Sequence, residues 1–374
     1  MLMGDTRRQR LVRVGAAAST LALVSSGVAL SAASAATHRS QQGHARAHKS
    51  ANNGMPDLSY FKGKTITIIA PDKPGGGYDL YARTIAPGLA QVLHATVNVT
   101  NNAGAGTIAG TNQLWSSAPN GLTIGEAAVG GDIASLVEKQ PGQNFNLRKF
   151  QWLGQIGNSP DVLVVQPNSP YKLFTELLHS KATVAVDDVR NGVGDLLDRV
   201  IFGAFNIKHT FITGYTSTGS LKQGFLAGDG TALIENIPTL MPMLESQQGR
   251  ALLVTAKPAA LPRAIPHAVK GVPTLAQELS SAKVHLTKKE SAAVTEAVSL
   301  ASLAYDFAAP PGTPKKIVQT LRTAFLDAIK LPVVKSQALK EIVPLQPIPG
   351  QKLNKDIATA LGQASIVKPY VTAS

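Results

Sequence analysis

Short apolar runs alternate with stretches whose apolar residues recur at helical spacing, and this alternation is the strongest structural signal in the chain. Residues 65–70 form a continuous β-branched and apolar run, which predicts a strand buried on both faces. Helical patterns separate most runs of this kind, so their order predicts an α/β fold with mostly parallel sheets. We predict the further strands at residues 96–101, 122–127, 161–166, 181–186, 209–214, 231–235 and 250–255.

Two predicted helices have recognisable features. Asp79 begins a helical pattern that contains Pro87, a residue that should kink or shorten a helix. A second helix is predicted over residues 313–330, where Thr313 can cap the first turn and Pro314 suits the first helical position. An apolar residue at every fourth position of this helix predicts a face packed on the core. These residues are Ile317, Leu321, Phe325 and Ile329.

The N-terminal segment has the order of a secretory signal. Residues 7–13 are basic, residues 14–33 are apolar but rich in Ala, Ser and Gly, and Ala33-Ser34-Ala35 offers a small-x-small cleavage site. This order predicts a signal peptide over residues 1–35. An uncleaved membrane anchor fits less well, because the apolar stretch has many small polar residues and few Leu or Phe.

Residues 36–56 are polar and predict a disordered linker, because they offer almost no apolar surface to bury. The export route stays open between the general secretory and twin-arginine pathways, since Arg10 stands where a twin-arginine signal usually has a large apolar residue. We expect an exported protein, periplasmic or in the cell envelope or extracellular. It would not be anchored through a lipidated cysteine, because the chain has no cysteine.

The charge balance favours anionic partners. The 374 residues carry a formal net charge of +13, which would attract an anionic metabolite or nucleic acid. Nucleic acid is disfavoured because the Lys and Arg residues are scattered and no long basic run is interleaved with aromatics. The charge therefore points to a small anion rather than to DNA or RNA.

Four glycine-rich turns stand between predicted strands and helices, at residues 74–79, 103–107, 190–195 and 214–220. Each can direct free backbone N–H groups and a helix N-terminus at an anion. Asp79 is predicted to cap its own helix, because an acid directed at a carboxylate would repel it. The first turn lacks the Gly-Lys-Ser/Thr ending of a nucleotide-binding loop, so the pattern favours a carboxylate over a nucleotide.

Signals for catalysis are weak. Ser169-Pro170-Tyr171-Lys172 fits a Ser-x-x-Lys pattern by letter only, because the Pro is unsuited to the helical setting of that nucleophile. Histidines occur singly along the chain, and no acid pair has the spacing of a hard-cation site. We therefore predict no enzymatic activity, no cofactor and no metal.

Several motifs, in order along the chain, resemble one family. Pro74-Gly75-Gly76-Gly77-Tyr78-Asp79 followed by Ala82-Arg83 resembles the opening of the tripartite tricarboxylate transporter substrate-binding proteins, also called the Bug family. The resemblance extends over about residues 60–345. The further motifs are Asn101-Asn102-Ala103-Gly104-Ala105-Gly106, Ala118-Pro119-Asn120-Gly121-Leu122-Thr123, the segment from Gly214-Tyr215 to Leu221, Gly249-Arg250-Ala251-Leu252-Leu253-Val254-Thr255, Val272-Pro273-Thr274-Leu275 and Ala309-Pro310-Pro311-Gly312-Thr313-Pro314.

The resemblance implies an α/β, two-lobed flytrap of the type 2 periplasmic-binding-protein kind, with mostly parallel mixed sheets and a central ligand cleft. Residues 57–157 and 301–374 would form the first lobe, and residues 158–300 the second. The ligand would be held mainly by main-chain amides, hydroxyls and water, with Asp79 as the helix cap of the binding loop. The ligand-binding residues that it implies are Gly75, Gly76, Gly77, Tyr78, Gly106, Thr107, Gly192, Val193, Thr216, Ser217, Thr218, Ser220, Glu235 and Asn236.

Some positions depart from the family pattern and leave the ligand open. Residues 216–219 replace the usual Lys-Gly-Ser, Glu235 stands in place of Asp, Asn101 stands in place of Glu, and Asp195 adds an acid. The implied function is capture of a di- or tricarboxylate, amino acid or aromatic acid by a monomer, with delivery to a large and a small membrane subunit. The alternative is a sensory binding protein that signals to a receptor kinase.

Overall fold

The computed structural model describes residues 57–180, 184–187, 193–215, 217–255, 269–281 and 285–372. The chain divides into two compact units, Met1–Asn53 and Gly54–Ser374, and every described residue belongs to the second. The predicted signal peptide and linker therefore lie outside the described residues. No helix in the described ranges is long and apolar enough to cross a membrane.

One six-stranded sheet has the order β11-β4-β10-β3-β1-β2. β1 pairs in parallel with β2 and β3, whereas β10 runs antiparallel to both β3 and β4. The strands are β1 (Thr65–Ala70), β2 (Thr96–Asn101), β3 (Thr123–Ala127), β4 (Gln151–Gln155), β10 (Asp306–Ala309) and β11 (Ile348–Pro349).

A second, five-stranded sheet has the order β7-β6-β8-β5-β9. β6 pairs in parallel with β7 and β8, and β5 runs antiparallel to β8 and β9. The strands are β5 (Asp161–Val165), β6 (Val184–Asp187), β7 (His209–Ile212), β8 (Ala232–Asn236) and β9 (Arg250–Val254).

The sheets are mixed, as expected, but parallel pairs do not predominate over antiparallel ones, which corrects that part of the expectation. Parallel and antiparallel pairs occur in both sheets. Residues 161–165 are fully buried in the described structure, and a continuous apolar run of this kind shows only that both faces are covered. It carries no information on the direction of the neighbouring strand. The existence and place of the strands were predictable for this reason, while their direction was not.

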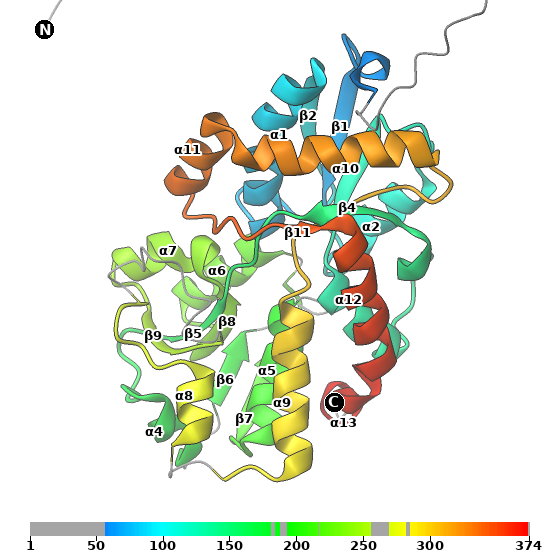
Figure 1. The fold of residues 1–374 in the computed structure, drawn as a ribbon. Coiled ribbons are helices and arrows are strands. Elements are labelled where there is room, and N and C mark those ends of the chain that lie inside the picture. Colours follow the sequence, from blue (N-terminus) through cyan, green and yellow to red (C-terminus); the bar gives the residue numbers. More distant parts are fainter. Residues whose placement is uncertain are drawn as a thin grey trace, which may run out of the picture. The chain divides into compact units, whose positions relative to one another are not determined.

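Helices surround both sheets (Figure 1). α1 and α10 pack against each other, and α5 packs against α9. The α-helices are α1 (Gly77–Leu93), α2 (Ile108–Ser116), α3 (Val129–Glu138), α4 (Phe174–Leu178), α5 (Val193–Ala204), α6 (Thr218–Ala227), α7 (Ile237–Glu245), α8 (Leu275–Ser280), α9 (Lys288–Ala301), α10 (Lys315–Lys330), α11 (Pro332–Lys340), α12 (Gly350–Gln363) and α13 (Lys368–Val371). Short 3-10 turns lie at Leu58–Tyr60, Leu147–Lys149 and Ala364–Ile366.

Two expectations about helix ends need correction, namely a shortening of α1 at Pro87 and a Thr313 cap on α10. α1 continues through Pro87 to Leu93, so the proline does not end the helix. α10 has Pro314 at its N-cap position, and the Thr313 hydroxyl donates to the Pro310 carbonyl at 2.8 Å instead of capping the helix. Tertiary packing outweighs the local preference in the first case, because α1 is held between the sheet and α10.

The predicted apolar face of α10 is confirmed. Leu321, Phe325 and Ile329 are buried, and Ile317 is partly buried against the same core. Phe325 meets Phe307 of β10 with the ring centroids 5.2 Å apart. This packing fixes β10 in the middle of the first sheet and so fixes the segment just before it, which reaches the site described next.

Candidate ligand-binding site

One cavity lies where the polar ends of strands from both sheets come together. It is lined by Asp72 and Gly77 after β1, by Thr107 after β2, and by Glu235 and Asn236 at the end of β8. The carboxyl ends of parallel strands are the usual place for ligands in α/β folds. The cavity therefore combines turns from two different sheets around one space.

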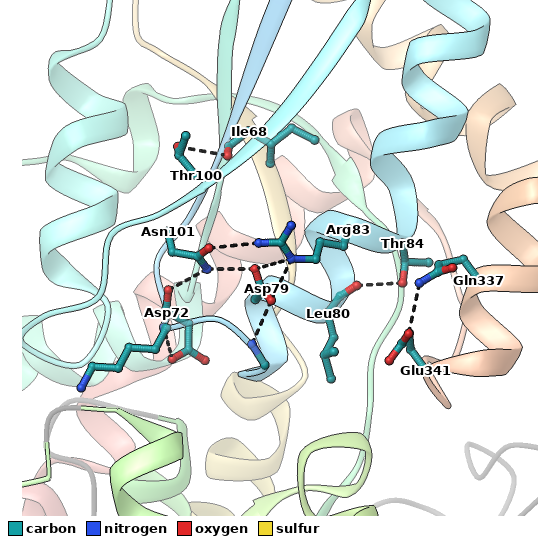
Figure 2. Close-up of polar contacts among 12 residues, drawn as sticks. Ile68, Asp72, Asp79, Leu80, Arg83, Thr84, Thr100, Asn101, Gln337 and Glu341 are labelled. Carbon is teal, nitrogen blue, oxygen red and sulfur yellow. Dashed lines mark hydrogen bonds and ion pairs between the residues drawn. The ribbon is translucent and has the colours of Figure 1, made fainter. Parts of the chain in front are cut away.

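The turn between β1 and α1 is held in shape by Asp79 (Figure 2). The Asp79 carboxylate accepts hydrogen bonds from the Gly75 amide and from Asn101 Nδ2, each at 2.9 Å. It also forms an ion pair with Arg83, whose Nε lies 2.9 Å away. Burial opposes ionisation of Asp79, but the bonds from Arg83, Gly75 and Asn101 outweigh it and lower its pKa. Asp79 is therefore a structural anion that fixes the turn.

The predicted helix cap needs correction. α1 begins at Gly77, and Gly76 is its N-cap residue without a side-chain cap. Asp79 is the third residue of the helix, and its carboxylate reaches back to the Gly75 amide. The Gly75 amide already donates to Asp79. Of the backbone amides that follow it at the start of α1, those of Gly77 and Tyr78 belong to residues that line the cavity, so they remain for a ligand.

Asp72 lies on the cavity side of the same turn. Its Oδ1 accepts the Lys73 amide at 2.7 Å, and its side chain lines the cavity. Burial is the main reason why the pKa of Asp72 is raised to about 7, and the nearby Glu235 and Asp79 raise it further. The family resemblance did not include this residue.

Gly76 and Gly77 are required here by close packing. A Cβ atom on Gly76 would lie 1.8 Å from Asp72 Oδ2. A Cβ atom on Gly77 would lie 2.9 Å from both Asn236 Nδ2 and Tyr305 Oη. The start of α1 therefore touches a residue of the second sheet directly, and only glycine allows this approach.

Gly106 and Thr107 come to the cavity from the turn after β2. Gly106 has a φ of +76°, in the region that favours glycine. The Thr107 hydroxyl donates to Asp132 Oδ1 at 3.4 Å. Burial raises the pKa of Asp132 to about 8, against the opposing effect of the Thr107 and Thr111 hydroxyls. The threonine side chain is thus already engaged with Asp132.

Ser217, Thr218 and Ser220 lie at the start of α6. Ser217 Oγ accepts the Ser220 amide at 3.3 Å, and Ser220 Oγ accepts the Ser217 amide at 3.2 Å, which makes a reciprocal capping box. The Thr218 hydroxyl donates to Glu235 Oε1 at 3.1 Å. These hydroxyls shape the turn, while Ser217 and Thr218 also line the cavity.

Glu235 and Asn236 close the second-sheet side. Asn236 caps α7 by accepting the Thr239 amide at 3.0 Å, and its Nδ2 donates to Glu235 Oε2 at 2.9 Å. Burial raises the pKa of Glu235, while its hydrogen bonds from Asn236 and Thr218 act in the opposite direction. In the antiparallel register Asn236 pairs with Asp161, the first residue of β5. Strand pairing therefore brings Asp161 to the same cavity.

Three tyrosines pack together beside the start of α1, and two of them, Tyr78 and Tyr305, line the cavity. Tyr81 stacks on Tyr305 with the ring centroids 3.7 Å apart, and Tyr78 lies 5.1 Å from Tyr305. Tyr305 has a φ of +60°, a conformation uncommon for an aromatic residue. This conformation comes just before β10 and lets the Tyr305 ring reach the cavity.

Most of the predicted binding residues that the structure describes lie around this one cavity. Gly75 and Gly76 belong to the same turn but do not line it, and Ser220 supports Ser217 from behind. Val193 begins α5, next to the lining residue Gly194, and Gly192 and Thr216 lie outside the described residues. The predicted residues that line the cavity are Gly77, Tyr78, Gly106, Thr107, Ser217, Thr218, Glu235 and Asn236.

Sequence reasoning missed Asp72, Asp161 and Tyr305, which also line the cavity. Asp72 follows directly on a buried strand, and Asp161 begins an otherwise apolar one, so both carried a usable signal as acids at strand ends. Tyr305 carried none, because its position depends on the pairing of β10 with strands far away in the sequence.

Solved structures with a similar fold include a periplasmic binding protein. The periplasmic binding protein BugD has a TM-score of 0.66 at 18% identity, with 82% of this chain and 97% of that chain covered. MatC from Rhodopseudomonas palustris has a TM-score of 0.62 at 20% identity, with 80% and 99% covered. The fold is therefore the two-lobed α/β fold of periplasmic binding proteins.

The family follows from the sequence. The model of the tripartite tricarboxylate transporter family receptor matches residues 81–367, and the chain belongs to this family. BugT of Bordetella pertussis is 28% identical over 205 residues, which cover 52% of this chain and 61% of BugT. A UPF0065 protein of the same organism is 32% identical over 120 residues, which cover 32% of this chain and 36% of that protein. The match to these two relatives thus spans less than two thirds of their length.

Proposed function

We propose that the protein is an extracytoplasmic solute-binding protein that captures a small organic carboxylate and delivers it to a membrane transporter. The observation that carries this proposal is the convergence of the α1 and α6 N-termini on one cavity between two sheets. Unpaired amides and the positive end of the helix dipole favour a carboxylate there. Delivery to a large and a small membrane subunit follows from the family and not from the cavity.

The ligands of structural neighbours support the same chemistry. MatC was solved with bound malate, and a second R. palustris protein, with a TM-score of 0.64, was solved with adipate. Both ligands are dicarboxylates. The family is that of a transporter receptor, so transport is favoured over signalling to a kinase. We further propose that the protein binds its ligand without catalysis, is exported to the periplasm and is a monomer.

Closure of two lobes over the ligand is part of the proposal. The proposed first lobe is made of residues 57–157 and 301–374, and the second of residues 158–300. Two connecting segments would join these lobes, and they meet at Gln155. Its Nε2 atom donates to the carbonyls of Ser302 at 2.7 Å and Ala304 at 3.0 Å. A hinge held together in this way would let the two sides of the cavity move while the connecting segments stay in register.

Calorimetric titration with malate, succinate, adipate, citrate and aromatic acids tests the proposal. We expect at least one to bind, and we expect Gly77→Asp to abolish that binding by adding bulk and negative charge at the start of α1. Gly362→Asp is the matched control, because Gly362 is exposed and a Cβ there meets no atom within 4 Å. Equal binding by wild type and Gly77→Asp would exclude this cavity as the site.

A further inference from the structure

The cavity is lined by acidic side chains, although the protein belongs to a family of tricarboxylate transporter receptors. The described residues that line it include five carboxyl side chains and no Lys, Arg or His. Asp195 is ion-paired with Arg199, and the Lys222 ammonium donates to the Thr239 carbonyl at 3.2 Å. The carboxyl side chains are Asp72, Asp161, Asp195, Asp198 and Glu235.

Asp161 is the least satisfied of these acids. Its residue is 7% exposed, and its side chain lines the cavity. The Asp161 amide and carbonyl are occupied by the Thr255 hydroxyl, at 3.0 and 3.2 Å. Within the described part of the chain, the hydrogen bond to its carboxylate comes from its own backbone amide, and no other residue donates to it. A buried carboxylate without such a partner is costly unless a cation or donor meets it.

We propose that the ligand carries a protonated amino group beside its carboxylate, and that Asp161, with Glu235 next to it, binds this ammonium. The proposal rests on the function proposed above and names the ligand class as amino acids. The amides of Gly77 and Tyr78 would bind the ligand carboxylate. Asp161 lies across the cavity on the second sheet, so the two charged ends of a zwitterion meet groups of opposite sign.

One observation favours an organic ammonium over a metal ion as the group that meets Asp161. In the described residues, no three acids or histidines come together in the way a metal ion requires, so the carboxylates do not converge on one cation centre. Burial, and then Glu235, raises the pKa of Asp161 well above its ordinary value, so the neutral acid is favoured while no cation lies beside it. A bound ammonium would reverse this effect and stabilise the ionised carboxylate.

A ligand whose ends are both carboxylates would meet the opposite situation. One end would meet the amides of α1, and the other would lie among Asp72, Asp161 and Glu235. It could bind there only if these acids were protonated and donated hydrogen bonds to it. The two arrangements differ in a single ligand group, the amino group, and can be separated by ligands that differ only in that group.

The test is calorimetric titration at pH 8 with three matched pairs: aspartate and succinate, glutamate and glutarate, and alanine and propionate. We expect the amino member of at least one pair to bind about tenfold to a hundredfold more tightly, the range that a hydrogen-bonded charge contributes. Asp161→Asn should remove this preference while leaving any binding of the diacid in place. Asp356→Asn, on the exposed face of α12, is the matched control and should change nothing.

The outcomes separate the ammonium site from carboxylate capture. Equal or tighter binding of the deaminated members would overturn the ammonium site and leave carboxylate capture intact. No binding in any pair, by a protein with an unchanged cooperative thermal melt, would contradict the ammonium site, and carboxylate capture would be contradicted only if the wider panel of malate, adipate, citrate and aromatic acids also failed to bind. If Asp161→Asn does not fold, Glu235→Gln replaces it, and an unchanged amino preference in that variant would contradict the proposed pair.

Discussion

Two aspartates in the turn between β1 and α1 are buried to almost the same extent and behave in opposite ways. Asp79 is 3% exposed and Asp72 is 7% exposed. Asp79 is held by Arg83, Asn101 and the Gly75 amide, and its pKa is lowered. Asp72 accepts the backbone amide of Lys73, and its pKa is raised to about 7.

Hydrogen-bond and ion-pair partners distinguish the charge of these two acids, because they outweigh burial at Asp79 and do not at Asp72. Burial acts on both residues in the same direction. For Asp79, three donors reverse that effect, because each stabilises the ionised form. One side of the turn is therefore a fixed structural anion, and the other is an acid whose charge responds to what enters the cavity (Figure 2).

The largest expected effect is that of Asp79→Ala. This change leaves the Gly75 amide, Asn101 and Arg83 without their shared acceptor, and we expect a loss of about 2–3 kcal/mol in the free energy of unfolding. Asp72→Ala should cost clearly less, because it removes one amide contact. Urea denaturation of both variants measures the difference, and equal losses would show that the two acids do not have distinct roles.

Gly76→Ala links the two acids and should have the next largest effect. Its Cβ would overlap Asp72 Oδ2, and we expect a loss of about 1–3 kcal/mol from overpacking. Adding Asp72→Ala should recover most of this loss. The matched control is Gly75→Ala, which meets no atom within 4 Å but has a φ of +83°. Its strain should cost about 1 kcal/mol, and Asp72→Ala should not rescue it.

The sequence was informative where the signal is local. The run at 65–70 and the glycines after it located β1 and the turn, and the motifs in register identified the family. The roles of Asp72 and Asp161 depend on which residues face them from other strands, such as the pairing of Asp161 with Asn236. The sequence predicts a cap at Asp79 because it does not reveal that Arg83 and Asn101 share its carboxylate.

Asp72→Asn tests the charge assignment through pH. The folded-state pKa of Asp72 is about 7 against an ordinary value of 3.8, so the folded protein holds this proton more tightly than the unfolded chain does. Its contribution to stability is complete below about pH 4 and is lost as the pH rises through 7. Asp72→Asn should therefore raise the free energy of unfolding at pH 8 by about 1 kcal/mol. Asp132 has a pKa raised to about 8, so the variant's free energy of unfolding should still fall as the pH rises. A variant less stable than wild type at pH 8 would contradict the assignment.

Arg83→Gln should have the smallest effect and shows which of the bonds to Asp79 matter. The Arg83 side chain is 48% exposed, and a half-exposed ion pair contributes about 0.5 kcal/mol, since water and salt screen it. The loss should shrink further in 1 M sodium chloride. A loss as large as that of Asp79→Ala would mean that the ion pair, and not the bonds from Gly75 and Asn101, fixes the turn. A small loss means that the amide donors alone suffice to keep Asp79 ionised, so the α1 N-terminus keeps its shape whether or not the guanidinium is in place.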